Sequence, residues 1–250
     1  TRYTLRQEDV QIDDAYCDPT APLVSLSLCA QRGKYLTSLI GYTYLYDRRN
    51  DPINPTRGFR FDVSQDLAGI GGDVNYISTE VTGGWYYGFN KDFILSVTGQ
   101  GGYIAGWSGD TVRVNSRFYK GGNSFRGFET AGIGPRDTNF GRSDALGGRA
   151  YAIGSAELTI PTGLPEQYGI KAALFTDVGT LGLLDDKDKL KADGTVDPLI
   201  YDDLSLRATA GLSVFWRSPM GPIRFDFSQV LAKEDYDKTE TFRFSTSTRF

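Results

Sequence analysis

The stretch YKGGNSFRG, residues 119–127, decides how this chain folds. It lies in a long, glycine-rich connector between two runs that are predicted to be strands, and it places Arg126 between Phe125 and Phe128. An arginine flanked by aromatic residues is unusual for an exposed loop and suggests that the connector folds inward. A buried guanidinium without a partner is costly, so the chain must offer it carboxylates.

Runs of alternating apolar and polar residues occupy most of the chain on either side of this connector. Most of them have the length of about 9–11 residues that a tilted strand needs to cross a bilayer. The runs are residues 2–12, 36–48, 58–67, 75–89, 93–107, 149–162, 170–181, 204–217, 222–231 and 241–250. No stretch of comparable length shows the helical period, so the sequence predicts an all-β chain.

Alternation alone does not separate a soluble sandwich from a membrane barrel, but the connectors do. The turns FNKDF (residues 89–93) and RSPMGPI (residues 217–223) are short, whereas residues 13–34, 107–148 and 182–203 form long polar connectors. Short and long connectors alternate in outer-membrane barrels, where they are periplasmic turns and extracellular loops. Aromatic residues near the strand ends fit interfacial girdles. We therefore predict a transmembrane antiparallel β-barrel.

Glu157 and Asp177, on the two runs after the connector, are the candidate partners of Arg126. Glu157 shares a face with Ser155, and the opposite face of that run is apolar: Ala150, Ala152, Ala156, Leu158 and Ile160. Asp177 similarly lies opposite Ala172, Leu174, Thr176 and Val178. A carboxylate that faces lipid is costly, so both should point into the barrel. We predict that the loop lies in the lumen and is pinned there by this acid pair.

Composition excludes several classes of function. The formal net charge of −4 argues against a nucleic-acid partner, because phosphate contacts require a basic surface. The chain contains no histidine, which excludes histidine-based triads and histidine-ligated metal sites. Glycine clusters at residues 69–72 and 99–102 lie in strand regions rather than before helices, so they do not indicate a nucleotide site. We expect no catalytic residue, metal or cofactor.

The two cysteines, Cys17 and Cys29, lie in one polar connector. Without histidine or a second cysteine pair, a zinc site is not expected, and a disulfide in an oxidising compartment is favoured over two free thiols. The chain starts inside a strand-like run and not at a methionine. We expect that it was processed or is a piece of a longer protein.

The segment FYKGGNSFRGFE, residues 118–129, resembles the loop-six motif of the BamA family of outer-membrane assembly factors. Further segments resemble that family in the same order along the chain. They are YDRRNDPINPTRG (residues 46–58), GGRAYAIGSAELTIP (147–161), LFTDVGT (174–180) and WRSPMGPIRFDFSQ (216–229). The resemblance covers essentially the whole chain, which ends in a strand that closes on phenylalanine.

The resemblance implies a site and a place in a larger protein. In that family the loop-six arginine bonds acids on the two following strands, which here implies Arg126 with Glu157 and Asp177, within the motif Phe125, Arg126, Gly127 and Phe128. The family has POTRA domains followed by a sixteen-stranded barrel in the bacterial outer membrane. Residues 1–250 would then be strands seven to sixteen, with the POTRA domains and first strands absent. A closed ten-stranded barrel is the weaker alternative.

The implied function is the assembly and insertion of other outer-membrane proteins, without covalent catalysis. Implied partners are unfolded outer-membrane clients, outer-membrane lipids and, through the absent POTRA domains, assembly-machinery lipoproteins. A client strand would add at a lateral gate formed by the last strand, which carries Phe242, Phe244 and Phe250. The alternative is a translocation or secretion pore, as in TamA and the two-partner secretion transporters, which share the loop motif. An outer-membrane protease or phospholipase is disfavoured by the lack of histidine.

Overall fold

The computed structural model describes residues 1–18, 23–191, 195–218 and 221–246. In these residues one antiparallel sheet of ten strands has the order β1-β2-β3-β4-β5-β8-β9-β11-β12-β13. The strands are β1 (Arg2–Val10), β2 (Gly33–Asp47), β3 (Arg57–Ala68), β4 (Tyr76–Gly88), β5 (Ile94–Gly106), β8 (Ala150–Ile160), β9 (Ile170–Gly182), β11 (Arg207–Ser218), β12 (Gly221–Ala232) and β13 (Phe242–Thr246). Each corresponds to one predicted run, and the all-β prediction is confirmed.

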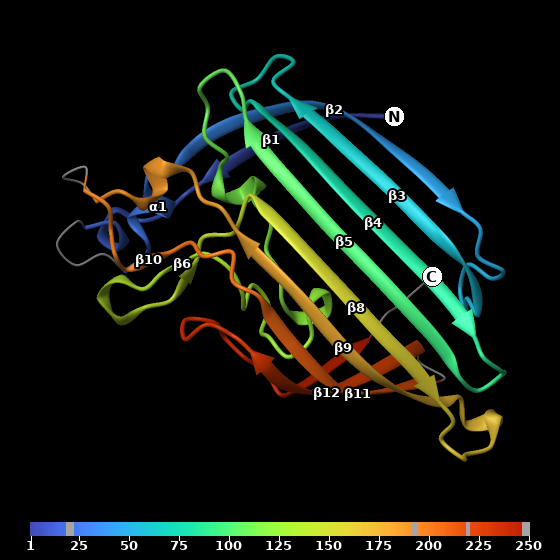
Figure 1. Cartoon of the computed structure of the whole chain (residues 1–250). Coiled ribbons are helices and arrows are strands. Elements are labelled where there is room, and N and C mark those ends of the chain that lie inside the picture. Colours follow the sequence, from blue (N-terminus) through green and yellow to red (C-terminus); the bar gives the residue numbers. More distant parts are fainter. Residues whose placement is uncertain (19–22, 192–194, 219–220, 247–250) are drawn as a thin grey trace.

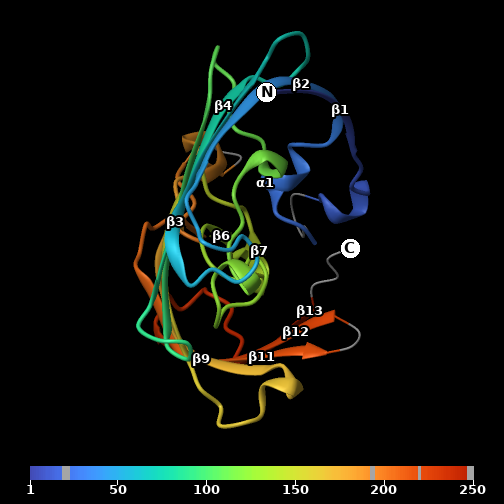
Figure 2. The same ribbon diagram turned by 90° about the vertical axis from the view of Figure 1, so that its right-hand side faces the viewer.

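The sheet is strongly curved (Figures 1 and 2). Its two faces differ in chemistry. Figure 2 shows the connector between β5 and β8, with β6 and β7, inside the concave side of the sheet. In β11 the concave face buries Arg207, Thr209 and Ser213, whereas Leu212 and Trp216 on the convex face are exposed. Polar residues inside and apolar residues outside are the distribution of a barrel wall in lipid. No helix of the described residues is long and apolar enough to span a membrane.

The connectors after β1, β5 and β9 are long, as the sequence predicted, but the alternation is not strict, because the consecutive connectors after β2, β3 and β4 are all short. The β2–β3 turn shows how a short connector is fixed, because the side-chain oxygen of Asn50 accepts hydrogen bonds from the main-chain N–H groups of Thr56 and Arg57, at 3.0 and 2.9 Å. Gly58 ends this turn with φ +103°, and a Cβ there would lie 2.2 Å from the main-chain oxygen of Arg48. Glycine is therefore required at this position.

The long connectors contain short elements that the sequence did not predict. Two-residue strands β6 (Arg136–Asp137), β7 (Asp144–Ala145) and β10 (Ile200–Tyr201) form a second small sheet in the order β10-β6-β7. The β1–β2 connector contains a four-residue helix, α1 (Leu26–Cys29). Ser25 before this helix donates to Asp137 at 2.6 Å, which ties the connector to β6. Elements this short depend on tertiary contacts and leave no periodicity in the sequence.

Cys17 and Cys29 form a disulfide, with their Cα atoms 5.8 Å apart. The sequence left open a disulfide or two free thiols, and the structure has the disulfide. The bridge joins the chain after a short 3-10 helix, η1 (Asp14–Tyr16), to the end of α1. It closes the loop between the first two strands at the end of the sheet where the long connectors lie (Figure 1).

Candidate functional site

Two glycines set the path of the loop-six segment, which we define as residues 118–129. Gly121 has φ +127°, and a Cβ there would lie 2.0 Å from the main-chain oxygen of Glu129. Gly127 has φ +87°, and a Cβ there would lie 2.7 Å from a methyl carbon of Thr209 on the wall. Between them a single 3-10 turn, η3 (Gly122–Ser124), reverses the chain. The tight turn and the close approach to β11 place Arg126 against the concave face.

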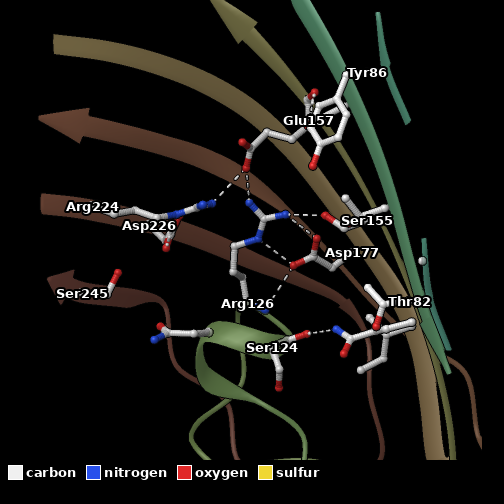
Figure 3. Close-up of a pocket in the computed structure, with 16 residues that line it drawn as sticks. Thr82, Tyr86, Ser124, Arg126, Ser155, Glu157, Asp177, Arg224, Asp226 and Ser245 are labelled. Carbon is white, nitrogen blue, oxygen red and sulfur yellow. Dashed lines mark hydrogen bonds and ion pairs between the residues drawn. The ribbon is translucent and has the colours of Figure 1, made fainter. Parts of the chain in front are cut away.

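Arg126 binds both acids that the sequence assigned to it (Figure 3). Its Nε donates to Asp177 Oδ2 at 2.7 Å, its Nη2 donates to Asp177 Oδ1 at 2.5 Å, and its Nη1 donates to Glu157 Oε2 at 2.6 Å. Its main-chain N–H also donates to Asp177 Oδ2, at 3.1 Å. Ser155 on β8 accepts a further bond from Nη2 at 2.7 Å. The guanidinium is thus bound by β8 and β9 together.

The pair of Arg126 and Asp177 is largely shielded from solvent. Their side chains are 8% and 4% exposed, and the guanidinium carbon lies 3.6 Å from the ring centre of Phe175. Phe125 and Phe128 are fully buried, with ring centres 5.1 Å apart, and they belong to a core with Ile153 and Leu181. Charge-assisted bonds in such surroundings are stronger than surface ion pairs, which contribute about 0–1 kcal/mol. The loop is held by an apolar core and an ion pair.

Sequence reasoning missed a second arginine in this network. Arg224 on β12 donates from Nη2 to Glu157 Oε2 at 2.9 Å, so two guanidinium groups share one carboxylate oxygen. Arg224 also donates to Asp226 at 2.7 Å and to Ser213 at 2.9 Å. In the sequence Arg224 and Asp226 alternate with Ile223, Phe225 and Phe227, which assigns both to the polar face of their strand and is the available signal. It gave no reason to connect β12 with Glu157.

These groups line a cavity of about 580 Å³ on the concave face. Two arginines, Arg126 and Arg224, face three carboxylates, Glu157, Asp177 and Asp226, so the local charge is 2 − 3 = −1. Within the described residues, no three histidine, cysteine or acidic side chains group as a metal site would need. The arrangement supplies ionic bonds between strands and a loop.

The loop-six segment is also bonded to the connector that leads into β13, residues 233–241. The Glu129 N–H donates to Lys238 O at 3.0 Å, and the Lys238 N–H donates to Gly132 O at 2.9 Å. The Glu240 N–H donates to Gly127 O at 2.9 Å, and Phe128 forms a β-bridge with Thr239. These bonds join main-chain groups, so they cannot be predicted from a pattern of side chains.

The predicted gate residues lie at one edge of the sheet. In the described residues β13 pairs only with β12, from Ile223 opposite Thr246 to Phe227 opposite Phe242. Phe242 and Phe244 are about half exposed and pack against Phe225 and Phe227 of β12 with tilted rings. The ring centres of Phe225 and Phe244 are 5.5 Å apart, and those of Phe227 and Phe242 are 5.1 Å apart. Phe250 lies outside the described residues. An edge strand leaves N–H and C=O groups available for another strand.

The fold and the inward loop define an integral outer-membrane β-barrel protein. The Omp85 superfamily domain matches residues 1–250, and the chain belongs to the Omp85 superfamily. An apolar convex face is consistent with this location, because it is the face that meets lipid.

Comparison with individual proteins shows which members of this superfamily the chain resembles. The chain is 33% identical, over 90% of its length, to outer membrane protein assembly factor BamA of Neorickettsia risticii, and it spans 29% of that relative. It is 33% identical, over 64% of its length, to the sorting and assembly machinery component 50 homolog of Xenopus tropicalis, and spans 33% of it. Among solved structures, Haemophilus ducreyi BamA lacking POTRA domains 1–3 matches 97% of the chain with a TM-score of 0.76 and 24% identity, over 49% of that structure. The chain thus spans about a third or less of the two curated relatives.

Proposed function

We propose that this chain is part of an outer-membrane factor that assembles and inserts other β-barrel proteins. The carrying observation is that the loop-six segment, pinned by Arg126, is bonded to the connector that leads into the edge strand β13. An available strand edge in lipid is costly, because water cannot satisfy its N–H and C=O groups. The edge of β13 would be the place where a client strand adds by β-augmentation.

The larger architecture forms part of the same proposal. Residues 1–250 would be strands seven to sixteen of a sixteen-stranded barrel, preceded in the full protein by six strands and POTRA domains. The fold match to the solved Haemophilus ducreyi BamA lacking POTRA domains 1–3, of which the chain covers 49%, supports this assignment. Clients would be unfolded outer-membrane proteins, and lipoprotein subunits would bind the POTRA domains. The lateral gate would be formed by β13, with Phe242, Phe244 and Phe250.

The secretion-pore alternative is not favoured, because the relatives that match this chain are named as assembly factors. We also infer that the protein catalyses no covalent reaction. Its buried charged cluster is fully engaged in holding a loop, and the chain has no histidine to act as a general base.

The test is insertion of an unfolded client barrel into liposomes that contain the full-length protein. We expect insertion by the wild type, and its loss in Arg126→Ala while the barrel remains folded. Arg217→Ala is the matched control, because Arg217 is an exposed arginine at the far end of β11. Equal insertion by Arg126→Ala and the control would show that Arg126 has a structural role only and is not needed for insertion. A wild type that conducts ions but inserts nothing would establish a pore instead.

A further inference from the structure

Arg224 makes a contact that its place in the sheet does not require. Glu157 lies on β8 and Arg224 lies on β12, and the sheet order places β9 and β11 between them. Three strand spacings separate the two residues, roughly 14 Å along the wall. They meet because the sheet curves and both side chains extend into the concave space, where the Arg224 Nη2 lies 2.9 Å from Glu157 Oε2 (Figure 3). The contact bridges the curved wall.

The bridge ends on the strand that carries the sheet edge. Arg224 lies directly opposite Ser245 of β13, and Asp226, which Arg224 also binds, lies opposite Arg243. Within the described residues, which stop at Thr246, the β12–β13 ladder covers five residue pairs, from Ile223–Thr246 to Phe227–Phe242. Main-chain bonds from the loop-six segment hold the other end of the hairpin, at residues 233–241. The hairpin is therefore held at two places: Arg224 on β12 contacts Glu157, the partner of Arg126, and residues 233–241 bond to the loop-six segment.

We propose that Arg224 is a positioning residue that fixes the β12–β13 hairpin to the loop-six network through the shared Glu157, so that loop six sets the position of the pairing edge. A positioned edge reduces the ordering that a client strand must accomplish when it pairs. The expected effect on client insertion rests on the proposed function, whereas the role of Arg224 in positioning the β12–β13 hairpin does not depend on it.

The competing explanation is that Arg224 only neutralises Asp226, two residues away on the same face of β12. Both residues are bound to Ser213 as well, at 2.9 Å from Arg224 Nη2 and 2.5 Å from Asp226 Oδ1. On that view Arg224 removal leaves an unpaired carboxylate, and removal of both charges repairs the defect. On the positioning view the double substitution does not restore the hairpin, because Glu157 has still lost its partner on β12.

The experiment measures the distance between spin labels at Asn123→Cys, in η3, and Ser245→Cys, on β13, in the full-length protein in bilayers. Both positions line the same cavity. We expect a narrow distance distribution in the labelled parent and in Arg217→Gln, and a broader one in Arg224→Gln and in Arg224→Gln with Asp226→Asn. A narrow distribution in Arg224→Gln, or its recovery in the double variant, would overturn the proposal.

Client insertion into liposomes gives the second readout. Arg224→Gln should slow insertion about tenfold, as loss of charge-assisted bonds implies. Arg126→Gln added to Arg224→Gln should slow it by less than the product of the two single effects, because both act through Glu157. Multiplicative effects would contradict a shared network. If the wild type inserts no client, the proposed function fails, and the distance measurement still decides the role of Arg224.

Discussion

Asp177 is the more buried of the two carboxylates that bind Arg126, and its substitution gives the sharpest test of the loop lock. Asp177→Asn removes the charge and nearly preserves the size of the side chain. Asp177 accepts three hydrogen bonds from Arg126, whereas Glu157 accepts one and shares its oxygen with Arg224. The two substitutions Asp177→Asn and Glu157→Gln should therefore differ in cost.

The magnitudes follow from burial. Removal of one partner from a buried ion pair costs about 3–5 kcal/mol, and because Glu157 continues to neutralise Arg126 we expect about 3 kcal/mol for Asp177→Asn. The Glu157 side chain is 19% exposed, and Glu157→Gln should cost about 1.5 kcal/mol, the lower value for bonds to a charged group. Arg126→Met combined with Asp177→Leu leaves no unpaired charge and should recover at least half of the Asp177→Asn loss.

Urea unfolding of the full-length protein in bilayers, followed by tryptophan fluorescence, gives the free energy of unfolding. Asp92→Asn, in the exposed turn between β4 and β5, makes the same chemical change away from the network and should alter it by less than about 0.5 kcal/mol. The reasoning is refuted if Asp177→Asn behaves like Asp92→Asn, or if Glu157→Gln is the more costly of the two.

Three further predictions concern the loops. Gly127→Ala should lower the urea midpoint far more than Gly71→Ala, since both have positive φ but only at Gly127 would the new Cβ collide with the wall. Replacement of Cys17 and Cys29 by alanine should speed proteolysis within the β1–β2 connector by roughly two orders of magnitude, measured by mass spectrometry, because closure of such a loop is worth about 3 kcal/mol. Partial desolvation of the Tyr119 side chain, in the β5–β8 connector, raises its pKa to about 12, so ultraviolet titration of Tyr119→Phe should lack one tyrosinate at the alkaline end only.

The sequence predicted the strands and the loop lock because both depend on local alternation. A two-residue period assigns each side chain to a face, and that placed Glu157 and Asp177 inside before any contact was known. Arg224 was assigned to the same face, but its contact with Glu157 depends on the curvature of four strands, which no local pattern encodes. The bonds between residues 233–241 and the loop-six segment join main-chain groups and are independent of side-chain identity. The strands β6, β7 and β10 have two residues each, too few to show a period.

The ion pair of Arg126 with Asp177 is stronger than the ion pair of Arg224 with Glu157, and this difference follows from solvent exposure. Arg126 and Asp177 are 8% and 4% exposed, whereas Arg224 is 30% exposed in its pair with Glu157. Solvent screens an exposed pair much more than a buried one, so the loop is held to β8 and β9 more strongly than β12 is held to the loop. The contact of Arg224 with Glu157 is therefore the weaker part of the network.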